Sequence, residues 1–356
     1  MNELLFSLLL VPIVGVALLT GVPVILTIER RGSAWIQRRS GPNRVGPWGL
    51  MQPLADAVKI VFKEENQPAD SNGFLFNFAP VLAVVPPILG FALIPFGGEV
   101  RIGDSNYSLQ IMASEIGVLL LLAITSLHVF SVLLAGWSSN NKFSLMGALR
   151  SGSQMISYEI AIGLSLVSLV LSYNTLDLRE IVYLQAAGPW GFARQPLCFL
   201  IMWICVFAEC NRLPFDLPEG ESELVAGYHT EYSGLKFGMF FMGEYVAMYL
   251  ASAFLATLFL GGFNIPFVEA SALQEFFASR GYSALWATNL TASLQVLSFV
   301  LKMYFFMWVF VWVRWTLPRF RYDQLMSLGW KVLLPLAVVN VIATMLFSFY
   351  EKGVGF

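Results

Sequence analysis

The 356-residue chain is 57% hydrophobic and only 12% charged, whereas an ordinary soluble domain is about a quarter charged. A chain this apolar could not cover its surface with polar groups in water, which excludes a string of soluble domains and an intrinsically disordered protein. The formal net charge of −2 gives no overall attraction to nucleic acid. A lipid bilayer is therefore the expected solvent.

The sequence shows no residue pattern of its own for redox or metal chemistry. Its three cysteines, Cys198, Cys205 and Cys210, lie in one apolar segment without a CxxC pair or a His at metal spacing. We interpret them as small buried hydrophobic residues and predict no metal site. Dinucleotide-binding, P-loop, HExxH, haem and Fe–S patterns are absent from the sequence, so any redox centre is expected to belong to another polypeptide.

Eight apolar windows approach the roughly 20 residues that a membrane-spanning helix needs. The fifth is short, and the windows cover residues 5–28, 75–96, 114–136, 151–172, 196–210, 237–261, 290–313 and 329–350. The first is not a signal peptide, because it carries Glu3, lacks a basic leader and is too long. We expect an all-α polytopic membrane protein, a single membrane domain over residues 1–356 with about eight transmembrane helices.

The basic residues predict the orientation of these spans. Of the 21 Lys and Arg residues, 15 lie in the connections after the first, third, fifth and seventh windows, if Lys331 at the start of the eighth window is counted with the last of them. The positive-inside rule places such connections on the cytoplasmic or matrix side, and both termini on the opposite side. The predicted cytoplasmic connections cover about 29–74, 137–150, 211–236 and 314–328.

The first connection contains a pattern typical of an amphipathic helix at the membrane interface. One helical face carries Leu50, Leu54, Val58, Val61 and Phe62, and the other carries Gln52, Asp56, Lys59 and Lys63. Such a helix either only anchors the connection or covers a cavity at the membrane edge. In the second case Asp56 and Lys59 face a ligand or a partner.

The connection after the fifth window is unusually acidic for a segment beside a membrane. Its acidic residues are Glu209, Asp216, Glu219, Glu221, Glu223 and Glu231. They alternate with apolar residues whose burial would be favourable, among them Leu213, Phe215, Leu217, Leu224, Val225, Tyr228 and Tyr232. The segment is either a solvated acidic loop or a partly buried cluster of carboxylates that can take up and release protons.

The seventh connection holds Arg314, Arg319, Arg321 and Asp323. One interpretation is anchoring at the membrane surface together with a local contact between Arg321 and Asp323. The other is a docking surface for a soluble partner.

Several ionisable residues lie within or at the edge of the apolar windows, among them Glu115, Glu159, Glu209, Glu244 and Lys302. A charge at the centre of a bilayer costs on the order of 3 kcal/mol or more, so such groups usually line a polar path or pair with one another. Isolated protonated carboxyls that bond between helices are the alternative. Lys302 could pair with one carboxylate, Tyr158 and Tyr245 could relay protons, and His128 is a weaker candidate.

Four long segments resemble one family, the H subunits of respiratory complex I (NADH:quinone oxidoreductase), whose mitochondrial counterpart is NADH-ubiquinone oxidoreductase chain 1. They are ERRGSAWIQRRSGPNRVGPWGLMQPLADAVKIVFKE, GWSSNNKFSLMGALRSGSQMISYE, RLPFDLPEGESELVAGYHTEYSGLKFGMFFMGEY and RWTLPRFRYDQLMSLGWK. The resemblance covers nearly the whole chain. It implies a protein of the bacterial cytoplasmic membrane or the mitochondrial inner membrane.

The resemblance also implies a function and the residues that perform it. The chain would form the chamber through which ubiquinone or menaquinone enters, beside soluble quinone-site and Fe–S subunits and small and antiporter-like membrane subunits. NADH, FMN and Fe–S clusters would belong to partners. The chamber would be lined by Glu29, Arg30, Asp56, Lys59, Arg212, Phe215, Asp216, Glu219, Glu221, Glu223, Tyr228 and Glu231. A proton path would include Glu159, Glu209, Glu244 and Tyr245, with Glu115 and Lys302 as further candidates.

One position departs from the family pattern, and other functions remain open. Some members carry a Glu in the third span where this chain reads Ser126-Leu127-His128, so the path runs through other groups or His128 or Glu115 substitutes. The alternative is the membrane anchor of a related proton-pumping hydrogenase or formate hydrogenlyase. A stand-alone ion transporter would show internal repeats, which the sequence lacks, and a purely structural anchor leaves the buried acids unexplained.

Overall fold

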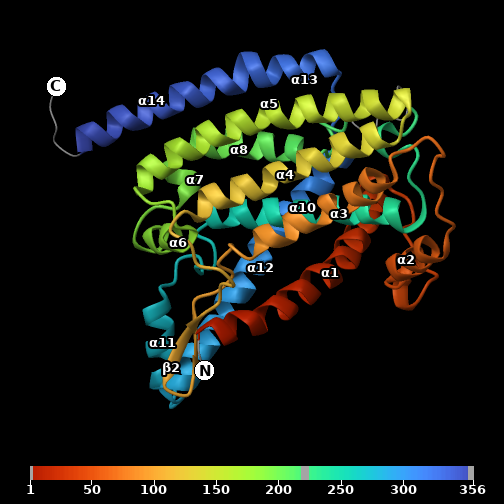
Figure 1. Ribbon diagram of the computed structural model, residues 1–356. Coiled ribbons are helices and arrows are strands. Elements are labelled where there is room, and N and C mark those ends of the chain that lie inside the picture. The colour runs from red at the N-terminus through yellow and green to blue at the C-terminus, as the bar shows by residue number, and fades with distance from the viewer. Residues whose placement is uncertain (1–2, 218–223, 352–356) are drawn as a thin grey trace.

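The computed structural model describes residues 3–217 and 224–351, and in this part of the chain nearly all regular structure is helical (Figure 1). Seven helical segments here are long and apolar enough to cross a membrane. They are α1 (Glu3–Ile36), α3 (Gly73–Phe91), α4 (Gly117–Ser138), α5 (Lys142–Tyr173), α10 (Gly234–Phe259), α12 (Ala284–Thr316) and the continuous segment Tyr322–Tyr350. The prediction of an all-α polytopic membrane protein is confirmed.

The fifth predicted span is the exception in length. It forms α8 (Pro196–Glu209), whose 14 residues extend for only about 21 Å, less than the thickness of a bilayer core. Cys198 and Cys205 of α8 and Cys210, directly after it, are buried, as predicted. The last span is built from α13 (Tyr322–Leu328), a π-helical turn η3 (Gly329–Leu333) and α14 (Leu334–Glu351).

The remaining elements are short and join the long helices. They are the 3₁₀ turns η1 (Pro47–Gly49) and η2 (Gly227–His229), the helices α2 (Gln52–Phe62), α6 (Leu178–Ala187), α7 (Gly191–Arg194) and α11 (Ala270–Ser279), and the strands β1 (Glu99–Ile102) and β2 (Ser105–Ser108). The two strands form an antiparallel hairpin in which Val100 pairs with Tyr107.

The long helices pack side by side in an order that differs from their order in the chain. Successive contacts run from α14 to α5, α4, α3, α10, α12 and α1, and α8 packs against α5 (Figure 1). α10 lies inside this array, and most of its residues after Gly243 are buried. The side chains of α10 can therefore meet groups from both halves of the chain.

The predicted amphipathic helix is confirmed as α2. Its apolar side chains are left uncovered by the rest of the chain, with Leu54, Val58 and Val61 exposed by 54 to 60%. On the polar side, Arg30 of α1 forms an ion pair with Asp56 at 2.5 Å, which ties α2 to the end of α1. An exposed apolar face beside the first span fits a helix that lies on lipid or against another subunit.

A close approach between α5 and η2 fixes the segment that follows α8. Gly147 of α5 lies against the backbone of Gly227 and Tyr228, so that an added Cβ would come within 2.8 Å of the Gly227 Cα. Ser144, one turn earlier, donates to the carbonyl oxygen of Tyr228 at 2.8 Å. Only glycine permits this contact, and the contact in turn places the side chain of Tyr228.

We predict that Gly147→Ala destabilises the protein by about 1 to 3 kcal/mol, because a methyl group would push against backbone atoms that cannot move aside. Gly163→Ala, in the same helix with no atom near its added Cβ, should be neutral or slightly stabilising. Thermal unfolding of the two variants in detergent measures the difference. Equal midpoints would show that the packing of α5 on η2 is not tight.

Candidate functional site

Two ion pairs, one buried and one with a partly exposed arginine, join helices that are distant in the sequence. Glu29, near the end of α1, pairs with Arg314 in the last turn of α12. Arg212, which follows α8, pairs with Glu244 of α10 at 3.5 Å, and both side chains are more than 90% buried. Charges removed from water need such partners, because an unpaired charge in an apolar interior is strongly unfavourable.

Tyr245 connects these two pairs. Its hydroxyl donates to Glu29 Oε2 at 2.6 Å, and the guanidinium of Arg212 lies 4.2 Å from the centre of its ring. Tyr228 adds a further bond, because its hydroxyl donates to Glu244 Oε1 at 3.2 Å. We call Glu29, Arg212, Tyr228, Glu244, Tyr245 and Arg314 the buried charge network.

The network draws together residues that the resemblance assigned to two different tasks. Glu29, Arg212 and Tyr228 were expected in the quinone chamber, and Glu244 and Tyr245 in the proton path. In the structure these groups form one connected set of contacts. Any change of charge at one of them is therefore felt by the others over a few ångströms in a poorly screened interior.

A smaller polar cluster lies at the junction of α1 and α2. Asp56 pairs with Arg30, accepts a bond from Gln52 Nε2 at 3.1 Å and lies 3.8 Å from the ammonium of Lys59. Partial burial raises the pKa of Asp56, but the bonds from Arg30 and Gln52 and the two positive charges outweigh it, so that the pKa is lowered. Asp56 is thus an anionic group with a fixed partner at neutral pH.

The acidic connection after the fifth predicted span is packed rather than solvated where the structure describes it. Phe215 is buried between the rings of Tyr158 and Phe320, each with a centroid distance of 5.6 Å. Asp216 forms an ion pair with Arg319 at 3.0 Å, and Glu231 accepts a 2.5 Å bond from Asn141 Nδ2.

The apolar residues that alternate with these acids behave in the same way. Leu217, Leu224, Tyr228 and Tyr232 are buried, and Val225 is largely exposed. The predicted chamber residues Glu219, Glu221 and Glu223 lie outside the described residues.

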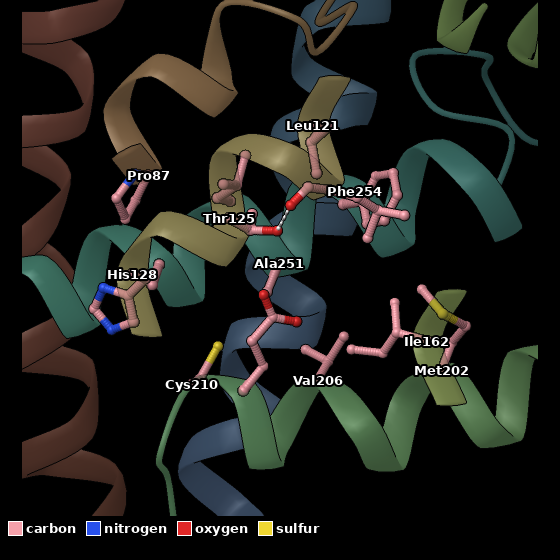
Figure 2. A pocket seen from close by; sticks show the side chains of 14 residues that line it. Pro87, Leu121, Thr125, His128, Ile162, Met202, Val206, Cys210, Ala251 and Phe254 are labelled. Atoms are coloured by element: carbon pink, nitrogen blue, oxygen red, sulfur yellow. Dashed lines mark hydrogen bonds between the residues drawn. The ribbon is translucent and has the colours of Figure 1, made fainter. Parts of the chain in front are cut away.

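Glu159 and Glu209 form a second group of acids between α4, α5 and α8. Ser126 of α4 donates to Glu159 Oε1. Glu209 lines a cavity of about 40 Å³ together with Thr125, His128 and Cys210, and lies within electrostatic range of Glu159. Figure 2 shows Thr125, on α4, and Cys210, directly after α8, projecting toward this space from opposite sides. The volume is sufficient for one or two water molecules.

Two candidates for the proton path lie apart from these acids. Glu115 is exposed in the turn before α4. Lys302 donates to three backbone carbonyls, and none of the ion pairs among residues 3–217 and 224–351 includes it. The suggestion that Lys302 pairs with a buried carboxylate was therefore wrong, because carbonyl oxygens satisfy its ammonium instead.

Sequence reasoning missed several partners of the predicted residues. It favoured a surface anchor or docking role for Arg314, which in the structure pairs with Glu29. It named Ser126 only as a position where some relatives carry Glu, whereas Ser126 donates a hydrogen bond to Glu159. A basic residue in the last turn of a long apolar helix was the available signal for Arg314. The expected local contact between Arg321 and Asp323 is present at 3.5 Å.

The sequence matches one protein family over most of its length. The family model described as NADH dehydrogenase matches residues 8–345. The NADH-quinone oxidoreductase H subunit of Salinibacter ruber is 51% identical over 330 residues, covering 92% of this chain and 91% of the relative. A corresponding H subunit of Cytophaga hutchinsonii is 48% identical over 316 residues, or 89% of each chain. The chain therefore belongs to the NADH dehydrogenase family of membrane subunits.

Proposed function

We propose that this chain is the membrane component of a proton-pumping NADH:quinone oxidoreductase that holds the quinone and links its reduction to proton movement. The relatives that cover about nine tenths of the chain carry the name NADH-quinone oxidoreductase. Ubiquinone or menaquinone is then the substrate, and NADH, FMN and Fe–S clusters act in partner subunits. The predicted cytoplasmic connections, with the ends of α1 and α12, face those soluble partners.

The observation that carries this proposal is the contact of Tyr245 with both ion pairs. Quinone reduction adds electrons and then protons to a headgroup, so groups beside the headgroup experience a new negative charge or lose a proton. A charge placed near Arg212 or Glu29 alters the balance between the Glu29–Arg314 and Arg212–Glu244 pairs. Chemistry in the chamber thereby changes the environment of Glu244.

From Glu244 the proposed path continues to Glu209 and Glu159. Cys210, directly after Glu209, lies within electrostatic range of Glu209, Arg212 and Glu244, which places it between the buried charge network and the second group of acids. The cavity at Glu209 offers room for water to connect side chains that do not touch directly. Glu115 and Lys302 are left out of the path because their positions separate them from these carboxylates.

We predict that Tyr245→Phe lowers the rate of quinone reduction roughly tenfold, because it removes a bond to a buried carboxylate and leaves the ring beneath Arg212 in place. Tyr282→Phe is the matched control, since Tyr282 is half exposed in the turn after α11 and lies outside the buried charge network. NADH:quinone turnover of the assembled complex in membranes measures both. Equal rates in the two variants would remove Tyr245 from the mechanism.

Glu159→Gln should lower the number of protons moved per electron while the complex still assembles, because the amide keeps the shape of the side chain without carrying a proton. Glu275→Gln, on the exposed helix α11, serves as the control. Proton uptake by membrane vesicles during NADH oxidation reports the ratio. A wild-type ratio in Glu159→Gln would contradict a path through this carboxylate.

A quinone analogue with a photoreactive headgroup should label peptides from residues 29–63 or 212–231 of this chain in the whole complex. Excess quinone should suppress the labelling, which mass spectrometry of digested peptides can localise. Labelling confined to other subunits would contradict the chamber role, and labelling absent from a complex that reduces protons instead would support the hydrogenase alternative.

A further inference from the structure

Lys302 is a buried ionisable residue that the proposed mechanism does not use. Its ammonium donates to the carbonyl oxygens of Leu260 at 2.7 Å, Gly262 at 2.9 Å and Asn264 at 2.5 Å. The ring of Trp190 lies on another side, with its centroid 4.7 Å from Nζ. The three carbonyls belong to the segment that ends α10, and we call them, with the Trp190 ring, the carbonyl cage.

The carbonyl cage requires a cation. Three carbonyl oxygens are acceptors only, and among lysine's two protonation states only the ammonium supplies three donors. The cage also lies at the C-terminus of α10, where the partial negative charge of the helix favours a positive group, and the face of an indole ring does the same. With its three donors bonded to carbonyl oxygens, the ammonium of Lys302 has no free donor to pass a proton along a path.

The same surroundings would suit a free monovalent cation. Rings of backbone carbonyls replace the hydration shell of K⁺ in channels, and the C-terminal ends of broken helices coordinate cations in transporters. Two cage residues, Trp190 and Asn264, also line a hollow of about 790 Å³ together with the acidic Glu269. This hollow gives a cation a route to the cage from the surface.

We propose that the carbonyl cage is a binding site for a small monovalent cation, of the size of K⁺ or ammonium, which the side chain of Lys302 fills permanently. The tethered ammonium clamps the end of α10 to α12. α10 carries Glu244 and Tyr245, and α12 carries Arg314, so this clamp sets the relative position of the helices that build the buried charge network. The assignment of the cage does not depend on the proposed function.

Other polar contacts link α10 and α12 directly or through α1, as expected if Lys302 holds one end of the two helices together. Tyr249 of α10 donates to the carbonyl oxygen of Gly21 at 2.7 Å and meets the Tyr304 hydroxyl of α12. Tyr245 and Arg314 meet at Glu29 near the other end. Lys302 thus belongs to a series of polar links that hold α10 and α12 in one register.

The test uses the whole complex carrying Lys302→Ala, heated at one temperature in choline chloride, potassium chloride or ammonium chloride of equal ionic strength. The amount of intact complex is followed on native gels, a readout that does not require quinone turnover. In choline the variant should dissociate at least about tenfold faster than wild type, because three bonds to a charged group are lost. Potassium should restore most of the lifetime, as should ammonium.

Two control variants sharpen the result. Lys302→Met fills the cage without charge and should dissociate quickly in all three salts. Leu301→Ala, a neighbouring change at an exposed position, should show no response to potassium. Potassium carries no proton, so a rescue by potassium cannot come from replacing a proton carrier.

Three outcomes would overturn the proposal. One is a Lys302→Ala lifetime in choline that equals wild type, and another is a short lifetime that potassium leaves unchanged. If Lys302→Ala does not assemble, Lys302→Gln takes its place, because its amide supplies two donors to the same carbonyls. The clamp predicts a lifetime for Lys302→Gln between those of Lys302→Met and wild type, and a lifetime equal to that of Lys302→Met is the third contradicting outcome.

Discussion

The protein must keep charged side chains inside an apolar helix array where little water is available to solvate them. The polar contacts of Glu244 and Tyr245 on α10 follow from this constraint. Arg212 and Glu244 neutralise each other, Glu29 and Arg314 do the same, and Tyr245 bonds to one pair while its ring supports the other. Removing one member of a buried pair costs about 3 to 5 kcal/mol, so the pairs also hold together helices that are distant in the sequence.

The same constraint makes the buried charge network sensitive to a new charge placed nearby. A surface ion pair adjusts to a new charge through solvent, whereas paired groups in a dry interior adjust through one another. The buried charge network pairs two basic with two acidic side chains. The Tyr245 hydroxyl bonds to Glu29 and can reorient when that carboxylate moves. A charge produced by quinone chemistry beside it would therefore change bonding at Glu244, on a helix whose far end the carbonyl cage of Lys302 holds in place.

Much of the fold could be predicted from local patterns, because hydropathy and periodicity within a short stretch of sequence are enough to predict a membrane span or an amphipathic helix. The spans at α1, α3, α4, α5, α10 and α12 and the interfacial helix α2 all follow from hydropathy and periodicity. The short α8 was recognisable as a weak window, but the hairpin of β1 and β2 and the helices α6 and α11 carry too little apolar sequence to stand out.

The candidate site was predictable in its acids but not in their partners. A Glu inside an apolar window is visible in one segment, whereas its partner comes from a helix that packing alone brings near. Arg314 lies 285 residues from Glu29, and the carbonyls around Lys302 have no side-chain signature at all. The resemblance to a known family led us to expect Glu29 and Arg212 in a quinone chamber, but the link through Tyr245 to both ion pairs required the three-dimensional structure.

The central claim is that the two ion pairs act as one unit through Tyr245. A double-mutant cycle of Glu29→Gln and Glu244→Gln, scored by NADH:quinone turnover of the assembled complex, tests it most directly. The account predicts strong non-additivity, with a coupling free energy of about 1 to 3 kcal/mol between positions that share no direct bond. Effects that add within about 0.3 kcal/mol would show that the pairs are independent and would contradict the account.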